Sequence, residues 1–291
     1  MSTSYVERIA VEIDGSGDSV LMIHGLGGTS NVWTPLLPAL ARFRTVRPDL
    51  PGAGRSHRVE GALSVDRFVR ALMRVCGAAG VERAHVVAHS MGTIIAFHLA
   101  LLEPRLVRSL ALFGPLTAPA EPSRGPIRAR GEKARNEGES GMQAIADAIV
   151  QAATSAETRT KRPVAVAAVR ESLMRQSPDG YARNCEALSQ MQAADVSKIA
   201  CPVLLVTGDE ASCDEGRALL GEGLTTVAVK RGLGAASARQ IPPVRARQLK
   251  FKRTQPADRL RFTPGVERID GRTIVARADT WWEAWNRFFF T

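Results

Sequence analysis

"VVAHSMGT" (residues 86–93) runs from buried-strand residues into a serine with a glycine close behind it. A strand that enters a tight turn at a serine and leaves as a helix forms a nucleophile elbow, which needs small residues two positions before and after the serine. Ala88 and Gly92 meet that need. We therefore predict that Ser90 is a catalytic nucleophile and that the amide of Met91, at the start of the helix, stabilises an oxyanion. The alternative is an ordinary strand-to-helix turn that contains a serine.

A glycine-rich turn, HGLGG (24–28), follows the apolar run SVLMI (19–23). Such a turn can bring a second backbone amide, that of Leu26, to the same oxyanion. The competing interpretation is a phosphate-binding loop. However, GLGGTS (25–30) lacks the third glycine of GxGxxG and the GK[ST] of a Walker motif. We therefore predict that the amides of Leu26 and Met91 together form an oxyanion hole.

Strand and helix patterns alternate on both sides of the elbow. Apolar or alternating runs predict strands at 6–13 (an antiparallel edge strand), 19–23, 43–50, 85–88, 109–114, 202–208 and 225–229. Helical periodicity predicts helices at 64–79, with Ser64 as N-cap, and at 91–103. In residues 118–199 it predicts further helices at 141–153, 163–176 and 180–192. The fold class is therefore α/β, a doubly wound and mostly parallel sheet with an inserted helical cap.

The segments HGLGG, RPDLPGAGRS, AHSMG and LLVTGDE, in this order and spacing, resemble the α/β-hydrolase superfamily from residue 5 to about residue 230. The cap segment SPDGYARNCEALSQMQAADVSKIACPVLLVTGDE (177–210) resembles the 3-oxoadipate enol-lactonases, and carboxylesterases share parts of it. The resemblance implies a Ser–acid–His triad with Ser90 as nucleophile, an acyl-enzyme intermediate and no cofactor. It also implies a small-molecule ester or lactone as substrate.

The sequence departs from the family pattern at the acid. The family acid falls three residues after the glycine of the TGDE turn, and here that position is Ala211. Asp209 and Asp214 are the nearest substitutes. We take Asp209 as the candidate acid, with capping or bracing of its loop as the alternative role.

The family histidine is also missing, because KRGLGAASARQ (230–240) contains none and no histidine follows His98. His57, in the loop after PGAGRS, is the best substitute. His89 precedes Ser90 on the strand and is expected to point to the opposite face. The resemblance makes His24 a brace of its loop, whereas His85 and His98 lie too far along their elements. We therefore expect catalysis to be impaired.

The end of the chain differs in composition from the rest. The net charge is +10, and from Arg231 onward there are 13 Lys+Arg against 5 Asp+Glu. Three of the four tryptophans also lie there, within a possible helix at 279–290. We predict core segments at 1–117 and 200–232, a helical cap at 118–199, and an atypical basic tail at 233–291. Our hypothesis for the tail is a frameshift or fusion between about codons 211 and 235, and the rival is a genuine divergent terminus, ordered or disordered.

Composition also bounds location and partners. The cysteines at 76, 185, 201 and 213 form no CxxC pair, which indicates reduced thiols in a cytoplasm and no metal site. The first residues lack a secretory pattern, and the apolar stretch 94–102 is too short to span a membrane. Nucleic-acid binding through KFKR (250–253) is unlikely because no binding motif surrounds it. The oligomeric state is not predicted.

Two functions therefore stay open from the sequence. The first is hydrolysis of a carboxylic ester or lactone through an acyl-enzyme on Ser90. A substrate carboxylate would then need a cationic partner, and the cap offers Arg130, Arg170, Arg175 and Arg183. The alternative is a catalytically inactive protein of the same fold that binds a small acidic ligand or a protein partner.

Overall fold

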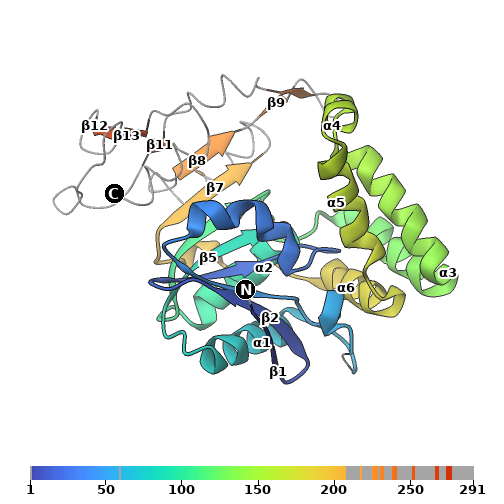
Figure 1. Ribbon diagram of the computed structural model, residues 1–291, viewed down its shortest axis with the longest axis horizontal. Coiled ribbons are helices and arrows are strands. Elements are labelled where there is room, and N and C mark those ends of the chain that lie inside the picture. Colours follow the sequence, from blue (N-terminus) through green and yellow to red (C-terminus); the bar gives the residue numbers. More distant parts are fainter. Residues whose placement is uncertain are drawn as a thin grey trace.

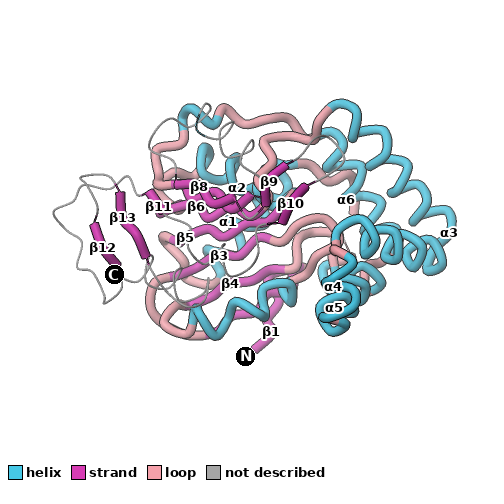
Figure 2. The backbone as a smooth tube through the Cα atoms, turned by 90° about the horizontal axis from the view of Figure 1, so that it is seen from above, coloured by secondary structure: helices cyan, strands magenta, loops and turns pink. Residues whose placement is uncertain are grey.

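The computed structural model describes residues 2–58 and 60–207, residue 217, and the short strands at 225–228, 230–232, 238–240, 251–252, 266–268 and 273–276. The main sheet contains β1 (Ser2–Val6), β2 (Ile9–Asp14), β3 (Ser19–Ile23), β4 (Arg44–Pro48), β5 (Ala84–His89), β6 (Val107–Phe113), β7 (Val203–Thr207) and β8 (Thr225–Ala228). Their order across the sheet is β1-β2-β4-β3-β5-β6-β7-β8, and Figure 2 shows β4, β3, β5 and β6 side by side. The strands from β4 to β8 in this order pair in parallel, and β2 pairs antiparallel with both of its neighbours. The predicted doubly wound, mostly parallel sheet is confirmed.

The predicted edge strand at 6–13 was wrong in its bounds. The chain turns at Glu7, which has φ 55°, so this stretch is split between β1 and β2. β2 therefore lies inside the sheet between β1 and β4 rather than at its edge. The break falls at the two consecutive polar residues Glu7 and Arg8, which interrupt the alternation between the two strands.

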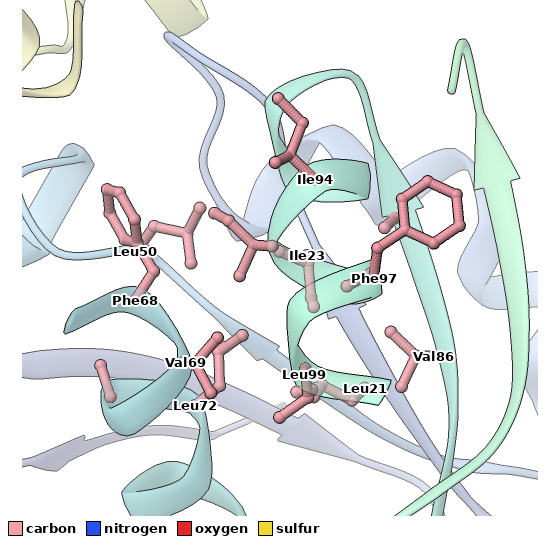
Figure 3. Packing of buried hydrophobic residues seen from close by; sticks show 14 of the residues in the cluster. Leu21, Ile23, Leu50, Phe68, Val69, Leu72, Val86, Ile94, Phe97 and Leu99 are labelled. Atoms are coloured by element: carbon pink, nitrogen blue, oxygen red, sulfur yellow. The ribbon is translucent and has the colours of Figure 1, made fainter. Parts of the chain in front are cut away.

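Two helices cover the middle of the sheet. α1 (Val65–Ala78) begins at Ser64, whose hydroxyl accepts a hydrogen bond from the Arg67 amide. α2 (Met91–Leu102) begins directly after Ser90. Figure 3 shows side chains of both helices packed over those of β3 and β5, among them Phe68, Leu72, Ile94, Phe97, Leu21 and Val86. This continuous apolar core holds the carboxyl ends of the central strands in fixed positions.

The predicted cap is a group of four helices to one side of the sheet (Figures 1 and 2). They are α3 (Glu121–Ala153), α4 (Ala156–Lys161), α5 (Pro163–Met174) and α6 (Pro178–Gln190). α3 continues through Gly138, a non-helical residue at φ 61°, so the predicted helix 141–153 is only its second half. A separate hydrophobic cluster fills the cap, formed by Ala134, Met142, Ile145, Ala146, Leu173, Tyr181 and Cys185.

The remaining described elements are short 3-10 turns and strands. The turns are η1 (Ser30–Leu40), η2 (Gly54–Ser56) and η3 (Val196–Lys198), and the strands are β9 (Lys230–Gly232), β10 (Ala238–Gln240), β11 (Phe251–Lys252), β12 (Val266–Arg268) and β13 (Thr273–Ala276). The possible helix at 279–290 lies outside the described residues, and the domain boundaries stay predictions. Within the part of the chain that is described, no helix is both long and apolar enough to cross a membrane.

Candidate active site

Three loops meet where the central parallel strands end. Residues 24–28 follow β3, residues 49–56 follow β4, and Ser90 follows β5. In a doubly wound sheet, ligands bind at the carboxyl ends of the strands. The candidate site therefore lies at the edge that the sequence motifs predicted.

Ser90 has the backbone of a strained elbow. Its φ of 52° and ψ of −123° are rare for a residue with a side chain. The turn is tight because α2 approaches β3 closely: a Cβ on Gly92 would lie 2.5 Å from the carbonyl oxygen of Ile23. Ala88, two residues before the serine, is fully buried. The small residues at these two positions thus have the steric reason that the sequence predicted.

Thr93 anchors the elbow from within. Its buried hydroxyl lies 2.6 Å from the Ser90 carbonyl oxygen and accepts a hydrogen bond from the Leu116 amide at 2.9 Å. The Ser90 amide donates to the Phe113 carbonyl at 3.0 Å, which extends the β5–β6 pairing to the serine. The elbow is therefore fixed to α2 and to the end of β6, a connection that the sequence did not indicate.

The loop of residues 24–28 turns the Leu26 amide outward. The Gly25 carbonyl accepts hydrogen bonds from His24 Nδ1 at 2.8 Å and from the Gly28 amide at 3.0 Å. A trans peptide directs its C=O and N–H to opposite sides, so the Leu26 N–H points away from these donors. Neither the Leu26 nor the Met91 N–H has an acceptor among the described residues. Both amides are free to bind an oxyanion.

His24 is a brace and has no capacity left to act as a base. Its Nε2 accepts a hydrogen bond from the Leu50 amide at 2.8 Å, so the proton resides on Nδ1, which donates to Gly25. The ring is completely buried, and this burial lowers its pKa. His24 is therefore a neutral imidazole that ties the oxyanion loop to the loop after β4.

Three other histidines are engaged elsewhere. His85 Nδ1 lies 2.7 Å from Ser109 Oγ, and His98 Nε2 lies 3.1 Å from the Gln192 carbonyl oxygen. His57 Nδ1 lies 3.1 Å from the Gly54 carbonyl oxygen. His57 lines a pocket whose other walls come mainly from the cap, and Ser90 is not among its lining residues. The structure thus does not bring the predicted substitute base together with the serine.

The structure corrects the predicted orientation of the His89 side chain. A Cβ on Gly25 would lie 3.0 Å from Ser90 Cβ and 3.1 Å from His89 Nδ1, so both side chains face the same glycine. The alternation of a regular strand fails here because the backbone reverses at Ser90. The His89 ring reaches solvent, but the surrounding protein lowers its pKa by desolvation. No hydrogen-bond partner of this ring occurs among the described residues.

The acid cannot be placed. Asp209, Asp214 and Ala211 all lie outside the described residues. Among the residues that the structure describes, no group of three or more histidines, cysteines or carboxylates is arranged to hold a metal ion.

An ion network behind the site was missed in the sequence. Asp49 Oδ1 accepts a hydrogen bond from the Ser30 amide at 2.7 Å, and Asp49 Oδ2 accepts one from Arg55 Nε at 2.9 Å. Arg55 also pairs with Glu12 of β2 at 2.5 Å. Burial raises the pKa of Asp49, but the hydrogen bonds from Arg55 and Ser30 outweigh it and hold the pKa below its usual value. The sequence offered one sign of this network: Asp49 and Arg55 carry opposite charges and lie six residues apart in the turn PDLPGAGRS.

The cap arginines differ in their partners. Arg170 pairs with Asp147 at 2.6 Å, Arg175 with Glu171 at 3.6 Å, and Arg183 with Asp179 at 2.7 Å. Arg130 is half-buried, and its Nε has no hydrogen-bond partner among the described residues. Arg130 instead lies beside Cys185 and Tyr181 of α6 and forms none of the ion pairs found for the other three arginines.

Comparisons with known proteins agree with this geometry. A family model described as alpha/beta hydrolase fold matches residues 18–158. A second model, described as D-aminopeptidase, matches residues 186–249, which include the last turn of α6 and all of β7 and extend into residues that are not described.

The relatives are matched over different shares of their length. "Putative carbamate hydrolase RutD" of Azorhizobium caulinodans is 44% identical over 102 residues, which cover 35% of this chain and only 38% of that protein. The enol-lactonase of Burkholderia xenovorans is similar in structure with a TM-score of 0.69 and 25% identity, covering 84% of this chain and 94% of its own. A hydrolase of Pseudomonas aeruginosa gives a TM-score of 0.69 at 24% identity, covering 76% of this chain and 85% of its own.

A strained serine after a central parallel strand and beside a glycine-rich loop, with a group of helices to one side of the sheet, is the arrangement of the α/β-hydrolase fold. The family model and the similar structures support the same assignment from independent comparisons. The chain therefore has the α/β-hydrolase fold, which the family model matches over residues 18–158 and the similar structures share.

Proposed function

We propose that this protein hydrolyses a small carboxylic ester or lactone through an acyl-enzyme on Ser90. The observation that carries the proposal is the strained serine flanked by two amides without acceptors. Ser90 Oγ adds to the carbonyl carbon, and the Leu26 and Met91 amides stabilise the oxyanion. Collapse of this intermediate expels the alcohol, or opens the lactone ring, as the protonated base gives its proton to the leaving oxygen. A water that gives a proton to the same base then adds to the acyl carbon, and Ser90 leaves with that proton as the acid is released.

The base in this proposal is His89 rather than His57. Its ring faces the same glycine as Ser90 and is not occupied by another described group. His89 directly precedes Ser90 in the chain. In this proposal its ring takes the Ser90 proton through one intervening water. Its lowered pKa keeps the imidazole neutral at neutral pH, which a proton acceptor requires. A relayed proton transfer is less efficient than direct contact, so we expect slow turnover.

The substrate class follows from the relatives and from the cap. An enol-lactonase and a putative carbamate hydrolase are both named for substrates with an acyl carbonyl group. We propose that the substrate also carries a carboxylate, for which the half-buried Arg130 of the cap is the candidate partner. Asp209 stays the proposed acid partner. We propose no cofactor and no metal for this reaction.

A second function, binding without turnover, is favoured by one specific observation. Among the described residues, none forms a hydrogen bond to Ser90 Oγ, whereas a working nucleophile is normally in contact with its base. Under this alternative the protein would bind a small acidic ligand in the same cleft.

Hydrolysis of p-nitrophenyl acetate and of 3-oxoadipate enol-lactone tests the two functions. We expect turnover by the wild type that Ser90→Ala abolishes, with Ser140→Ala as the control, because Ser140 is an exposed serine of α3. His89→Ala should lower kcat by at least about 100-fold, the range for a general base, and His57→Ala should leave it unchanged. Wild-type rates equal to those of Ser90→Ala would reject the hydrolase and leave the binding function.

A further inference from the structure

We propose that Gln176, at the end of cap helix α5, is a positioning residue that holds the oxyanion loop in its active shape. This inference rests on the proposed function, because it concerns the Leu26 amide of the same site. It means that the cap shapes the catalytic geometry directly.

Gln176 connects three segments that are far apart in the sequence. Its Nε2 donates to the carbonyl of Gly27 at 3.2 Å and lies 3.4 Å from that of Gly28 and 2.8 Å from that of Ser172. Its Oε1 accepts a hydrogen bond from the Gly54 amide at 3.0 Å. The residue is only 4% exposed. One buried amide thus fixes the loop after β3 and the loop after β4 to the cap.

Two neighbours of Gln176 act on the same glycine. Ser172 Oγ donates to the Gly27 carbonyl at 2.9 Å. A Cβ on Gly27 would lie 2.4 Å from Leu173 Cδ2, and Gly27 has φ 73°. The last turn of α5 therefore packs against this loop through several atoms.

The connection reaches the Leu26 amide through a single turn. The Gly28 amide closes this turn by donating to the Gly25 carbonyl, and the Gly25–Leu26 peptide carries the proposed oxyanion donor. A movement of the Gly27 or Gly28 peptide therefore tilts the Leu26 N–H. Catalytic geometry tolerates displacements of only about 0.5 Å. The Leu26 side chain also packs against both the main core and the cap core, which adds a second link to the cap.

A glutamine suits this place because it donates and accepts without charge. Replacement by methionine keeps the length but leaves the Gly54 N–H and the Gly27 C=O without this partner, and such buried groups are costly. Glutamate would keep the acceptor for Gly54 but could not donate when ionised. Both substitutions should loosen the loop while the serine, His89 and the sheet stay in place.

The test compares Gln176→Met, Ser172→Ala and the control Gln143→Ala. Gln143 lines the same pocket as Gln176, but it is exposed and forms no hydrogen bond to a described residue. With p-nitrophenyl acetate, we expect kcat for Gln176→Met to fall about 10- to 100-fold, toward the loss of one oxyanion donor, with KM within about twofold of the wild-type value. Ser172→Ala should show a smaller loss, and Gln143→Ala none.

Amide hydrogen exchange over residues 25–28 gives a readout that needs no turnover. We expect faster exchange in Gln176→Met and wild-type exchange in Gln143→Ala, with circular dichroism of both variants as the control for folding. If the wild type shows no Ser90-dependent turnover, the proposed function fails and exchange alone decides the role of Gln176. Unchanged exchange, or a raised KM with unchanged kcat, would overturn the positioning role.

Discussion

Ser90 stores backbone strain at the nucleophile. A residue with a side chain at positive φ costs about 1–3 kcal/mol, and glycine avoids most of that cost. We expect Ser90→Gly to be more stable than Ser90→Ala by about 1 kcal/mol, measured by urea unfolding. Glu7 is the other described non-glycine residue at positive φ, so Glu7→Gly beside Glu7→Ala is a matched control for the backbone effect alone. Equal stability of the two Ser90 variants would mean that the turn relaxes when the serine is removed.

The pH dependence of turnover follows from the desolvation of His89. A base works only when unprotonated, and the pKa of His89 is lowered from 6.5. kcat/KM should therefore rise as the pH increases through a value below 6.5 and stay level above it. Loss of this rise in His89→Ala would support the assignment, whereas an inflection above 6.5 in the wild type would contradict it.

At the scale of single residues, the structure places Ser90, Leu26 and Met91 at the sheet edge where the sequence motifs put them, and their catalytic roles stay predictions. It could do so because the small residues around the elbow have a local steric cause. The orientation of His89 depends on where the strand ends, and the loop partners of Gln176, which are Gly27, Gly28 and Gly54, lie more than 100 residues away in the chain. Neither fact has a local pattern from which it could be predicted.

Helix α6 is in van der Waals contact with the loop after β4 through two glycines. A Cβ on Gly180 would lie 2.3 Å from the Gly52 carbonyl oxygen, and Asn184 Nδ2 donates to the Pro51 carbonyl nearby. Gly180→Ala should therefore force the cap away from the core and lower the free energy of unfolding by about 1–3 kcal/mol, measured by urea unfolding.

The control for this variant is Gly77→Ala in α1. A Cβ there meets no atom within 4 Å, and alanine favours a helix over glycine by about 0.5–1 kcal/mol. The two substitutions should thus change stability in opposite directions. A loss of similar size in both would show that the loss in Gly180→Ala does not come from the contact with Gly52.

The sequence predicted most elements but not all of their ends. Apolar runs with clear turns after them, such as β3 and β5, matched the structure within a residue or two. α3 begins much earlier than predicted because its first half is rich in glycine, arginine and glutamate and shows little apolar periodicity. That half is held against α6 by tertiary contacts, including a close approach of Gly131 to Cys185.

The ion network ties the first strands to the catalytic edge of the whole molecule. Burial raises the pKa of Glu12, but hydrogen bonds from Arg55 and Thr3 outweigh it, so the pKa of Glu12, like that of Asp49, is lowered. A carboxylate whose pKa is lowered by folding stabilises the folded state at pH values above its pKa in the unfolded chain. This stability is lost as the pH falls through its pKa in the folded protein.

We therefore expect the free energy of unfolding to decrease as the pH falls below 4.5, the ordinary value for Glu12. Arg55→Met removes the cation, so this variant should be less stable at neutral pH and should lose less on acidification. Urea unfolding between about pH 3 and pH 7 measures both effects. If the free energy of unfolding falls by the same amount in the wild type and in Arg55→Met, the acid sensitivity has its origin outside this network.

The tail hypothesis belongs to the scale of the whole chain. If a frameshift replaced the family terminus, the other reading frames of codons 211–235 should encode an aspartate turn and a glycine–histidine loop. Translation of all three frames of the resequenced gene checks this directly. If neither alternative frame encodes them, the basic tail is a genuine terminus.

Ser172 and Gln176, at and just after the end of α5, form hydrogen bonds to Gly27. The two pairs are separated by 145 and 149 positions in the sequence. Contacts of such separation form only after the intervening chain has been ordered, because closing a long loop has an entropic cost. The turn from Gly25 to Gly28 can close early in folding. The hydrogen bonds from the cap to the carbonyls of Gly27 and Gly28 should form last. During refolding, helical and sheet signals should therefore recover before the loop is protected, and catalytic competence would be the final property that this chain acquires.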